Sequence, residues 1–257
     1  SGADLVRYAQ ADASAAAHAL EQRRGAAGRT LVATDTVYSM DGRVAPLADL
    51  ARAAASAGAM LLVDEAHALG LLGPTGAGLA EALAAAGALD ASAITARVGT
   101  LSKALGGIGG FVAASREVCD LVVNRARPFI YTTALPAAAC EAARAAVAIV
   151  RAEPERGRRV LALAAHLRAA LGAKGFDTGG GEAAIVPIIV GEPERALALA
   201  AALLDRGIFC PAIRPPTVPP GTSRLRVSLT AGHTEDDVAR LVEALAAARD
   251  ALHFDPA

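Results

Sequence analysis

The sequence contains no tryptophan and few aromatic residues, and only two of its 25 basic residues are lysines, Lys103 and Lys174. Positive and negative charges nearly balance, giving a formal net charge of −1. Proteins that bind nucleic acid usually carry a basic excess or a basic stripe, because they neutralise backbone phosphates. We therefore expect no nucleic-acid partner.

Cysteine is also scarce, and long apolar runs are missing. The three cysteines, Cys119, Cys140 and Cys210, are odd in number and show no C-x-x-C spacing. This pattern argues against a disulfide framework and against a zinc site. No apolar run reaches the roughly 18 residues that a membrane-spanning helix needs. We expect a cytoplasmic protein that has no membrane partner and no bound metal.

Short apolar runs alternate with amphipathic stretches along the first half of the chain. Four runs have the composition of strands: residues 30–35, 59–66, 91–100 and 109–115. Residues 46–58 have helical periodicity and end at a glycine. Strands that alternate with helices predict an α/β fold with a mainly parallel sheet.

The second half of the chain has a different order of predicted helices and strands. Residues 136–172 are predicted to be helical, with an interruption at "RAEPERG". Beyond them, strand-like runs alternate with a helix at about 193–206 and a closing helix that Thr234 and the acidic residues behind it predict. We therefore predict a large-domain portion over residues 1–135, a connecting helical segment over 136–172 and a small α+β domain over 173–257.

The octapeptide "VDEAHALG", residues 63–70, has two interpretations. D-E-A-H is typical of nucleic-acid helicases, whose ATP site also needs a phosphate-binding G-x-x-x-x-G-K-[ST] loop. Neither Lys103, in "GTLSKALGG", nor Lys174, in "GAKGF", stands in such a loop. We therefore favour the other interpretation, in which a strand ends at Asp64 and His67 lies beside a cofactor.

Lys103 is the second feature of interest, because glycines flank it in a chain that otherwise uses arginine for positive charge. An amine can lose its proton and form a Schiff base, whereas a guanidinium cannot. A solvated lysine in a flexible loop is the alternative. A pyridoxal 5'-phosphate site needs such an amine together with a carboxylate for the ring nitrogen, a polar neighbour for the phenolic oxygen and hydroxyls for the phosphate. The chain offers these groups: Asp64, His67, Ser39, Thr100 and Ser102.

Five collinear blocks resemble the α-oxoamine synthases: "TDTVYSMDGRVAPL", "LLVDEAHALGLLGPTGAG", "GTLSKALGGIGGF", "FIYTTALP" and "AIRPPTVPPGTSRLRVSLTAGHT". Members of this family are fold-type-I pyridoxal phosphate enzymes that condense an amino acid with an acyl thioester. The resemblance runs from about residue 30 to the C-terminus. It implies an aspartate-aminotransferase-like α/β fold, with a mainly parallel sheet in the large domain and a small α+β C-terminal domain.

The resemblance also implies roles for individual residues. Lys103 would bind the cofactor aldehyde covalently and move the substrate α-proton. Asp64 would pair with the ring nitrogen, and His67 would hydrogen-bond the phenolic oxygen. Ser39 would contact the cofactor, and Thr100 would bind its phosphate.

Substrate and subunit contacts follow from the last two blocks. Arg214 matches the arginine that holds the substrate carboxylate, a task suited to a bidentate guanidinium, and Thr217 matches a substrate-contacting position. "YTTALP" matches a segment that reaches the neighbouring subunit's site, so Thr132 or Thr133 would bind the partner's phosphate. These assignments imply a homodimer.

The implied reaction is the decarboxylative condensation of L-alanine with a pimeloyl thioester, carried by coenzyme A or a carrier protein, in biotin biosynthesis. A sibling reaction of the glycine C-acetyltransferase or 5-aminolevulinate synthase type is the nearest alternative. A non-catalytic module that serves only folding or dimerisation is an alternative of a different class.

The beginning of the sequence departs from the family pattern. The family has an Asn-His-Ala-Ser-like stretch where this chain reads "SGAD", so Gly2 stands in place of the histidine. We expect the glycine-rich phosphate-binding turn and the residue that stacks on the cofactor ring to lie outside the present sequence.

Overall fold

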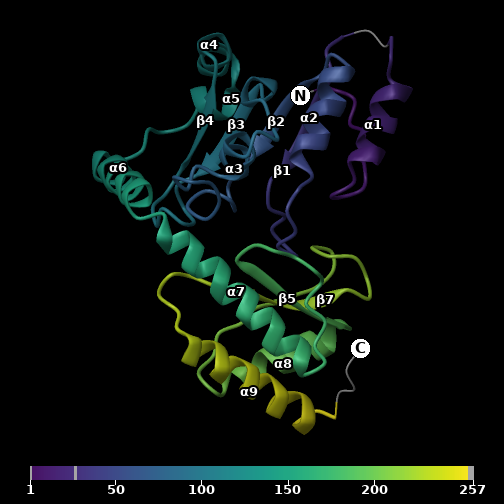
Figure 1. Cartoon of the computed structure of the whole chain (residues 1–257), viewed down its shortest axis with the longest axis vertical. Coiled ribbons are helices and arrows are strands. Elements are labelled where there is room, and N and C mark those ends of the chain that lie inside the picture. Colours follow the sequence, from purple (N-terminus) through teal and green to yellow (C-terminus); the bar gives the residue numbers. More distant parts are fainter. Residues whose placement is uncertain (1, 26–27, 254–257) are drawn as a thin grey trace. The chain divides into compact units, whose positions relative to one another are not determined.

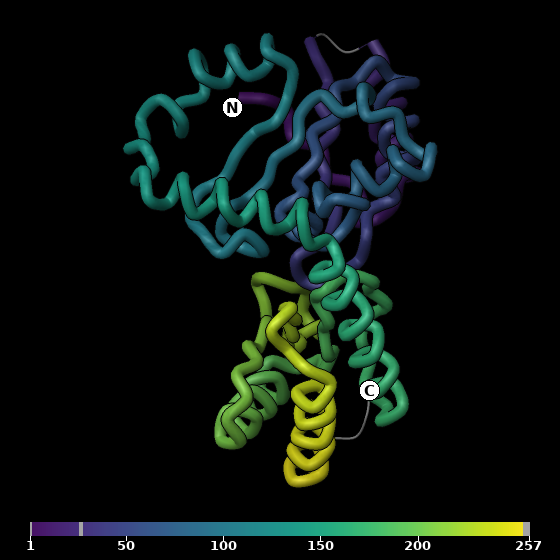
Figure 2. The backbone as a smooth tube through the Cα atoms, turned by 60° about the vertical axis from the view of Figure 1, so that its left-hand side comes forward, coloured from purple at the N-terminus to yellow at the C-terminus, as the bar shows by residue number. Residues whose placement is uncertain are grey.

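The computed structural model describes residues 2–25 and 28–253 and divides the chain into two compact units (Figure 1). Unit 1 comprises Ser1–Val37 and Ala45–Pro154, and unit 2 comprises Tyr38–Val44 and Glu155–Ala257. The trace in Figure 2 shows most of the purple-to-teal part of the chain in one body and the green-to-yellow part in another. Each unit is described by itself below.

Unit 1 is built on a four-stranded sheet in the order β1-β2-β3-β4. The strands are β1 (Leu31–Asp35), β2 (Met60–Asp64), β3 (Ala96–Thr100) and β4 (Gly110–Ala114). The first three strands pair in parallel, and β4 runs antiparallel to β3. All four fall within the apolar runs of the sequence, so the prediction of a mainly parallel sheet is confirmed.

Helix α2 (Leu47–Ser56) packs against this sheet and supplies much of its core. The helical elements are α1 (Ala13–Gln22), α2 (Leu47–Ser56), α3 (Leu79–Ala85), a 3-10 turn (Ala91–Ala93), α4 (Arg116–Arg125), α5 (Arg127–Ile130) and α6 (Ala137–Ala152). Leu47 and Leu50 of α2 are buried, as are Leu61 and Val63 of β2. Figure 1 shows α2 between β1 and α1, and α2 contacts both β2 and α1.

Strand β4 differs from the other strands in its exposure. Phe111 and Val112 are neighbours in the strand, so their side chains point to opposite faces of the sheet. Their exposed fractions are 39% and 40%, respectively. In the described part of the chain, β4 pairs with β3 alone. One edge and both faces of this strand are therefore accessible.

Unit 2 combines a three-stranded antiparallel sheet with three helices. The strands β5 (Ile185–Gly191), β6 (Ala212–Ile213) and β7 (Ser223–Ser228) have the order β5-β7-β6. The helices are α7 (Glu155–Ala173), α8 (Pro193–Leu204) and α9 (Glu235–Ala251), which Figure 1 shows together on one side of the sheet. Their apolar side chains meet the sheet in one core that includes Leu167, Ile188, Leu203, Leu225 and Leu245.

The predicted helical segment 136–172 consists of two helices. Helix α6 ends at Ala152 in unit 1, and α7 begins at Glu155 in unit 2. Pro154 lies in the break, where a proline cannot continue the hydrogen-bonding pattern of the preceding helix. The three-part division of the chain at residues 135 and 172 stays a prediction. None of the helices in the described ranges is at once long enough and apolar enough to cross a membrane.

The short segment 38–44 belongs to unit 2 because of its hydrogen bonds there. The Gly42 carbonyl oxygen accepts from the backbone N–H groups of Glu182 and Ala183, each at 3.0 Å. Gly42 has a φ of +69°, and a Cβ at this position would collide with the carbonyl oxygen of Ile185. Glycine is therefore required both for the left-handed conformation and for the close approach of the two backbones.

We expect Gly42→Ala to destabilise unit 2 more than Gly221→Ala does. Both glycines have positive φ, but a Cβ at Gly221 meets no atom within 4 Å. The left-handed conformation costs about 1–2 kcal/mol in each variant, and steric overlap adds about 1–3 kcal/mol at Gly42 alone. Urea unfolding followed by circular dichroism measures both free energies. Equal losses in the two variants would contradict the close approach of Gly42 to Ile185.

Candidate active site

Polar residues end each of the three parallel strands of unit 1. Asp35 ends β1, Asp64 ends β2 and Thr100 ends β3. Asp35 is paired in register with Asp64, and Asp64 with Val98. The carboxyl ends of parallel strands form the edge at which α/β proteins bind ligands. The candidate site therefore lies at this edge of the sheet.

The turn that follows β2 fixes the orientation of Asp64. Its Oδ1 atom accepts a hydrogen bond from the backbone N–H of Ala66 at 2.8 Å. Its carbonyl oxygen accepts from the backbone N–H of Thr36 at 2.9 Å, which ties the turn to the end of β1. The carboxylate therefore has little rotational freedom, as a group that pairs with a ligand atom requires.

Asp35 is a further carboxylate at this edge, and the resemblance to the α-oxoamine synthases implies no role for it. Burial raises the pKa of Asp35, the neighbouring Asp64 carboxylate raises it further, and the Lys103 ammonium lowers it. Asp35, Asp64 and Lys103 are thus close enough to interact electrostatically. The sequence places Asp35 at the end of a strand-like run, but only the register of β1 against β2 shows which residue it faces.

Lys103 lies in the loop between β3 and β4. Hydrogen bonds within this loop bring its two ends together. The backbone N–H of Leu101 donates to the Gly109 carbonyl at 2.9 Å, and that of Gly107 donates to the Leu101 carbonyl at 2.7 Å. The Thr100 hydroxyl is 2.7 Å from the Ser102 hydroxyl and 3.1 Å from the Gly109 carbonyl oxygen. The loop therefore presents two adjacent hydroxyls beside the exposed Lys103.

The loop that carries His67 packs against the loop that carries Lys103. The backbone N–H groups of Ala68 and Leu69 both donate to the carbonyl oxygen of Glu65, so His67 lies within a tight turn. Further along the same loop, a Cβ at Gly70 would come within 2.8 Å of the Ala104 Cβ. The structure thus brings His67 and Lys103 to the same edge of the sheet as Asp64.

The remaining predicted residues are distributed over both units. Thr132 and Thr133 are exposed in unit 1, in the segment after α5. Ser39, Arg214 and Thr217 belong to unit 2. The Ser39 carbonyl oxygen accepts from Nε of Arg226 at 2.7 Å, and the backbone N–H of Thr217 donates to the Arg214 carbonyl at 3.0 Å. The roles assigned to these five residues stay predictions.

The groups at the edge of the unit 1 sheet fit pyridoxal phosphate. They comprise an amine, a carboxylate held by a backbone N–H, an imidazole and a pair of hydroxyls, which match the aldehyde, ring nitrogen, phenolic oxygen and phosphate of that cofactor. Among the residues that the structure describes, no group of three or more histidine, cysteine, aspartate or glutamate side chains could hold a metal ion.

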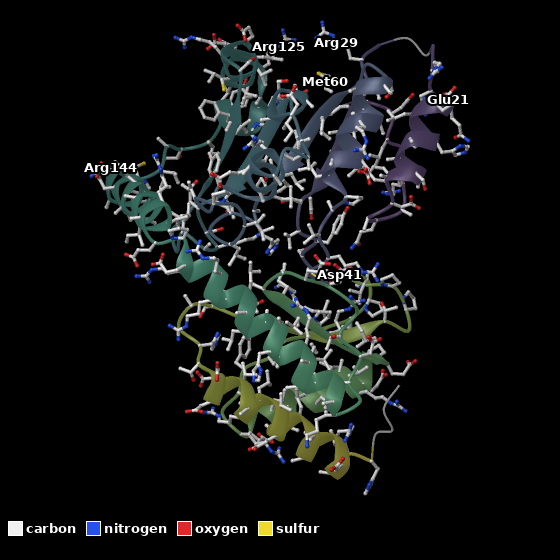
Figure 3. All side chains as sticks on the ribbon, in the orientation of Figure 1. Glu21, Arg29, Asp41, Met60, Arg125 and Arg144 are labelled. Carbon is white, nitrogen blue, oxygen red and sulfur yellow. The ribbon has the colours of Figure 1, made fainter. Side chains whose placement is uncertain are left out.

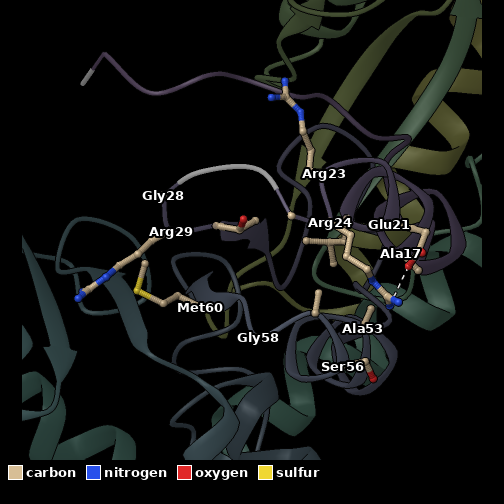
Figure 4. Close-up of a pocket in the computed structure, with 14 residues that line it drawn as sticks. Ala17, Glu21, Arg23, Arg24, Gly28, Arg29, Ala53, Ser56, Gly58 and Met60 are labelled. Carbon is tan, nitrogen blue, oxygen red and sulfur yellow. Dashed lines mark ion pairs between the residues drawn. The ribbon is translucent and has the colours of Figure 1, made fainter.

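A cavity of about 680 Å³ lies at the opposite edge of the same sheet (Figure 4). Its lining includes Thr30 and Met60, at the amino ends of β1 and β2, and Figure 3 shows Arg29 beside Met60 there. Arg24 in the lining forms an ion pair with Glu21 at 2.9 Å. This cavity shares no residue with the candidate site, and the amino ends of parallel strands are not the edge at which such sheets bind ligands.

Comparison with known proteins relates this geometry to a family of enzymes. Residues 1–245 match the aminotransferase class I and II family. The chain is 50% identical over 256 residues to an 8-amino-7-oxononanoate synthase of Anaeromyxobacter dehalogenans, covering 100% of this chain and 63% of that protein. A protein of the same name from Geobacter sulfurreducens is 48% identical over 248 residues, covering 96% of this chain and 62% of that protein. The chain thus spans less than two thirds of the length of these relatives.

Solved structures agree with this relationship. A serine palmitoyltransferase with bound pyridoxal phosphate superimposes with a TM-score of 0.91 at 33% identity, covering 98% of this chain and 63% of that one. The 8-amino-7-oxononanoate synthase of Francisella tularensis superimposes with a TM-score of 0.76 at 25% identity, covering 91% of this chain and 67% of that one. The predicted aspartate-aminotransferase-like fold type I is therefore confirmed.

The raised pKa of Asp35 predicts a pH-dependent stability. A carboxyl whose pKa is higher in the folded chain stabilises the fold most below its unfolded pKa of about 3.9, and this stabilisation is lost as the pH rises through the folded pKa. We therefore expect Asp35→Asn to raise the free energy of unfolding near neutral pH, with a gain that disappears toward about pH 4. Urea unfolding over a pH series measures this difference.

Asp90→Asn in the same unit is the control. Asp90 is exposed, and its hydrogen bonds from Ser92 lower its pKa, so its replacement should bring no gain in stability. A gain for Asp35→Asn that does not change with pH, or an equal gain for Asp90→Asn, would contradict the electrostatic interpretation.

Proposed function

Because the chain belongs to the aminotransferase class I and II family, we propose that it carries out a pyridoxal-phosphate-dependent condensation of L-alanine with a pimeloyl thioester. The products are 8-amino-7-oxononanoate, CO2 and the free thiol carrier, as biotin biosynthesis requires. The observation that carries the proposal is the meeting of Asp64, His67 and Lys103 at one sheet edge of a chain that is 50% identical to an 8-amino-7-oxononanoate synthase. A homodimer that acts in the cytoplasm is part of the proposal.

The residues of the site would hold the cofactor as follows. Asp64 would pair with the protonated ring nitrogen, His67 with the phenolic oxygen, and Thr100 together with Ser102 with the phosphate. Lys103 would bond the aldehyde. When bound, pyridoxal phosphate supplies an electron sink for the negative charge that develops at the substrate α-carbon.

Lys103 has two tasks in this proposal. Its amine would hold the cofactor through the aldehyde, and its Nζ, when not so bonded, would take the α-proton of the substrate. The Lys103 ammonium lowers the pKa of Asp35, and the Asp64 carboxylate raises it. Both carboxylates would therefore add negative potential around Lys103 when it holds that proton.

Substrate binding is assigned to residues outside the unit 1 sheet. Arg214 is exposed and carries a planar guanidinium that can bind the alanine carboxylate through two hydrogen bonds. Thr217 follows it at a distance of three residues and would contact the same substrate. Thr132 and Thr133 are exposed as well, and they would reach the phosphate of the partner subunit's site.

The scarcity of lysine makes the cofactor attachment testable at a single residue. We expect borohydride reduction of the chain with pyridoxal phosphate to fix one cofactor on Lys103, and Lys103→Ala to abolish this labelling. Lys174→Ala, which changes the only other lysine of the chain, is the matched control and should leave labelling intact. Peptide mass mapping locates the label. Equal labelling of both lysines, or none in the unchanged chain, would favour the structural-module alternative.

A thioester panel tests the substrates. We expect release of free thiol to be faster from pimeloyl-coenzyme A with L-alanine than from acetyl-coenzyme A with glycine, by about tenfold or more, because a pocket shaped for a longer chain gains binding energy from each methylene. The measurement is thiol release under saturating pyridoxal phosphate. Equal or faster turnover of the acetyl and glycine pair would replace this assignment with the glycine C-acetyltransferase reaction.

A further inference from the structure

Glu65, next to Asp64, is a buried carboxylate with several hydrogen-bond donors. Only 3% of the residue is exposed. Its Oε2 atom lies 2.8 Å from the Thr36 hydroxyl and accepts from the backbone N–H of Leu79 at 3.0 Å. Its Oε1 atom accepts from the backbone N–H of Ala80 at 2.9 Å. Both oxygens are therefore satisfied, as a buried charge requires.

The Glu65 side chain caps the N-terminus of helix α3, although Glu65 lies 14 residues before Leu79 in the sequence. Leu79 and Ala80 are the first residues of α3, whose N-cap residue Gly78 has no side chain to satisfy their N–H groups. Gly78 has a φ of +112°, and a Cβ there would come within 2.5 Å of the Glu65 Oε2 atom. The carboxylate thus takes the place of an N-cap side chain and benefits from the positive end of the helix dipole.

The same residue anchors the turn that carries His67. The Glu65 backbone N–H donates to the Val98 carbonyl at 2.8 Å, and its carbonyl oxygen accepts from Ala68 and Leu69. Its side chain reaches the end of β1 through Thr36 and the start of α3. Glu65 is therefore fixed on both its main chain and its side chain, with Asp64 before it and His67 two residues after it.

Neighbouring side chains at a strand end point to opposite faces of the sheet. The Asp64 side chain therefore lies on one face of the sheet and the Glu65 side chain on the other. On that second face, the Glu65 carboxylate contacts Thr36 and the start of α3. We propose that Glu65 is a positioning residue, which sets the placement of the His67 imidazole, and with it the Asp64 carboxylate, for the cofactor ring. The cofactor part of this inference rests on the function proposed above.

The first experiment reads the placement of His67 directly, without cofactor or turnover. The chain has five histidines, and in ¹³C-histidine-labelled protein His67→Gln identifies the ring signal of His67. In Glu65→Gln, an amide NH2 replaces one acceptor oxygen and faces N–H or O–H donors, so we expect the His67 signal to move while the other four stay in place. A His67 signal at its unchanged position would overturn the proposal.

Glu81→Gln is the matched control. Glu81 anchors the far end of the same loop, accepting from the Thr75 hydroxyl at 2.6 Å and the Ala77 N–H at 3.0 Å. Its variant should lower stability without moving the His67 signal. If Glu65→Gln does not fold, Thr36→Val takes its place, since it removes the hydroxyl that Glu65 Oε2 and the Asp64 carbonyl oxygen share and keeps both helix bonds. A smaller shift of the His67 signal in the same direction in Thr36→Val would support the proposal. An unchanged His67 signal in that variant would overturn it.

The second experiment adds pyridoxal phosphate and follows its visible absorbance. Partners that orient the ligands of a metal ion are worth about tenfold or more in affinity, and by analogy we expect Glu65→Gln to weaken cofactor binding by about tenfold. The double variant with His67→Gln should lose no more than His67→Gln alone, because both changes remove one interaction. Fully additive losses would overturn the proposal.

A chain that shows no cofactor absorbance in any variant would instead refute the proposed function. The histidine signals would then decide the positioning role of Glu65 by themselves.

Discussion

The parallel register of β1 against β2 is the constraint on which the candidate site depends. It places Asp35 beside Asp64 and aligns both with the start of the loops that carry His67 and Lys103. Because side chains alternate along a strand, a slip of β2 by one residue would exchange Asp64 and Glu65 between the two faces. The carboxylate assigned to the cofactor would then point at α3, and the helix cap would be lost.

This register depends on interactions at both ends of the strands. At the carboxyl end, Thr36 donates its backbone N–H to Asp64. At the amino end, the backbone N–H of Met60 donates to the Thr30 carbonyl at 2.9 Å. Leu61 and Val63 are fully buried, and Asp64 is the one polar residue of β2, so a slip by one residue would turn the Asp64 carboxylate toward the core in their place. The alternation of side chains along β2 therefore determines both which residues enter the core and which carboxylate lies at the site.

The sequence predicts the strands and the main chemical groups because both are local properties. An apolar run is visible in six residues, and a lysine among glycines or an Asp-x-x-His spacing is visible in a single loop. The role of Asp35 is not visible, since it depends on which residue faces it across the sheet. Glu65 is missed for the same reason, because its partners Leu79 and Ala80 lie 14 and 15 residues further along the chain.

The assignment of residues 38–44 to unit 2 is a third feature that local patterns cannot show. Arg224 and Arg226 of β7 donate to the carbonyl oxygens of Met40 and Ser39, across 184 and 187 residues of sequence. A segment that reads as a turn after β1 is held by a strand near the other end of the chain. Ser39 is therefore supported by different neighbours from those that support Asp64.

The exposure of β4 has a consequence for any work on this chain in solution. An edge strand with free backbone groups is a template on which another chain can add a strand, and Phe111 and Val112 offer apolar contacts on both faces. Such pairing is bimolecular, so its rate rises with the square of the protein concentration, whereas folding of the chain does not share that dependence. Dilution therefore separates folding of the chain from self-association through the sheet edge.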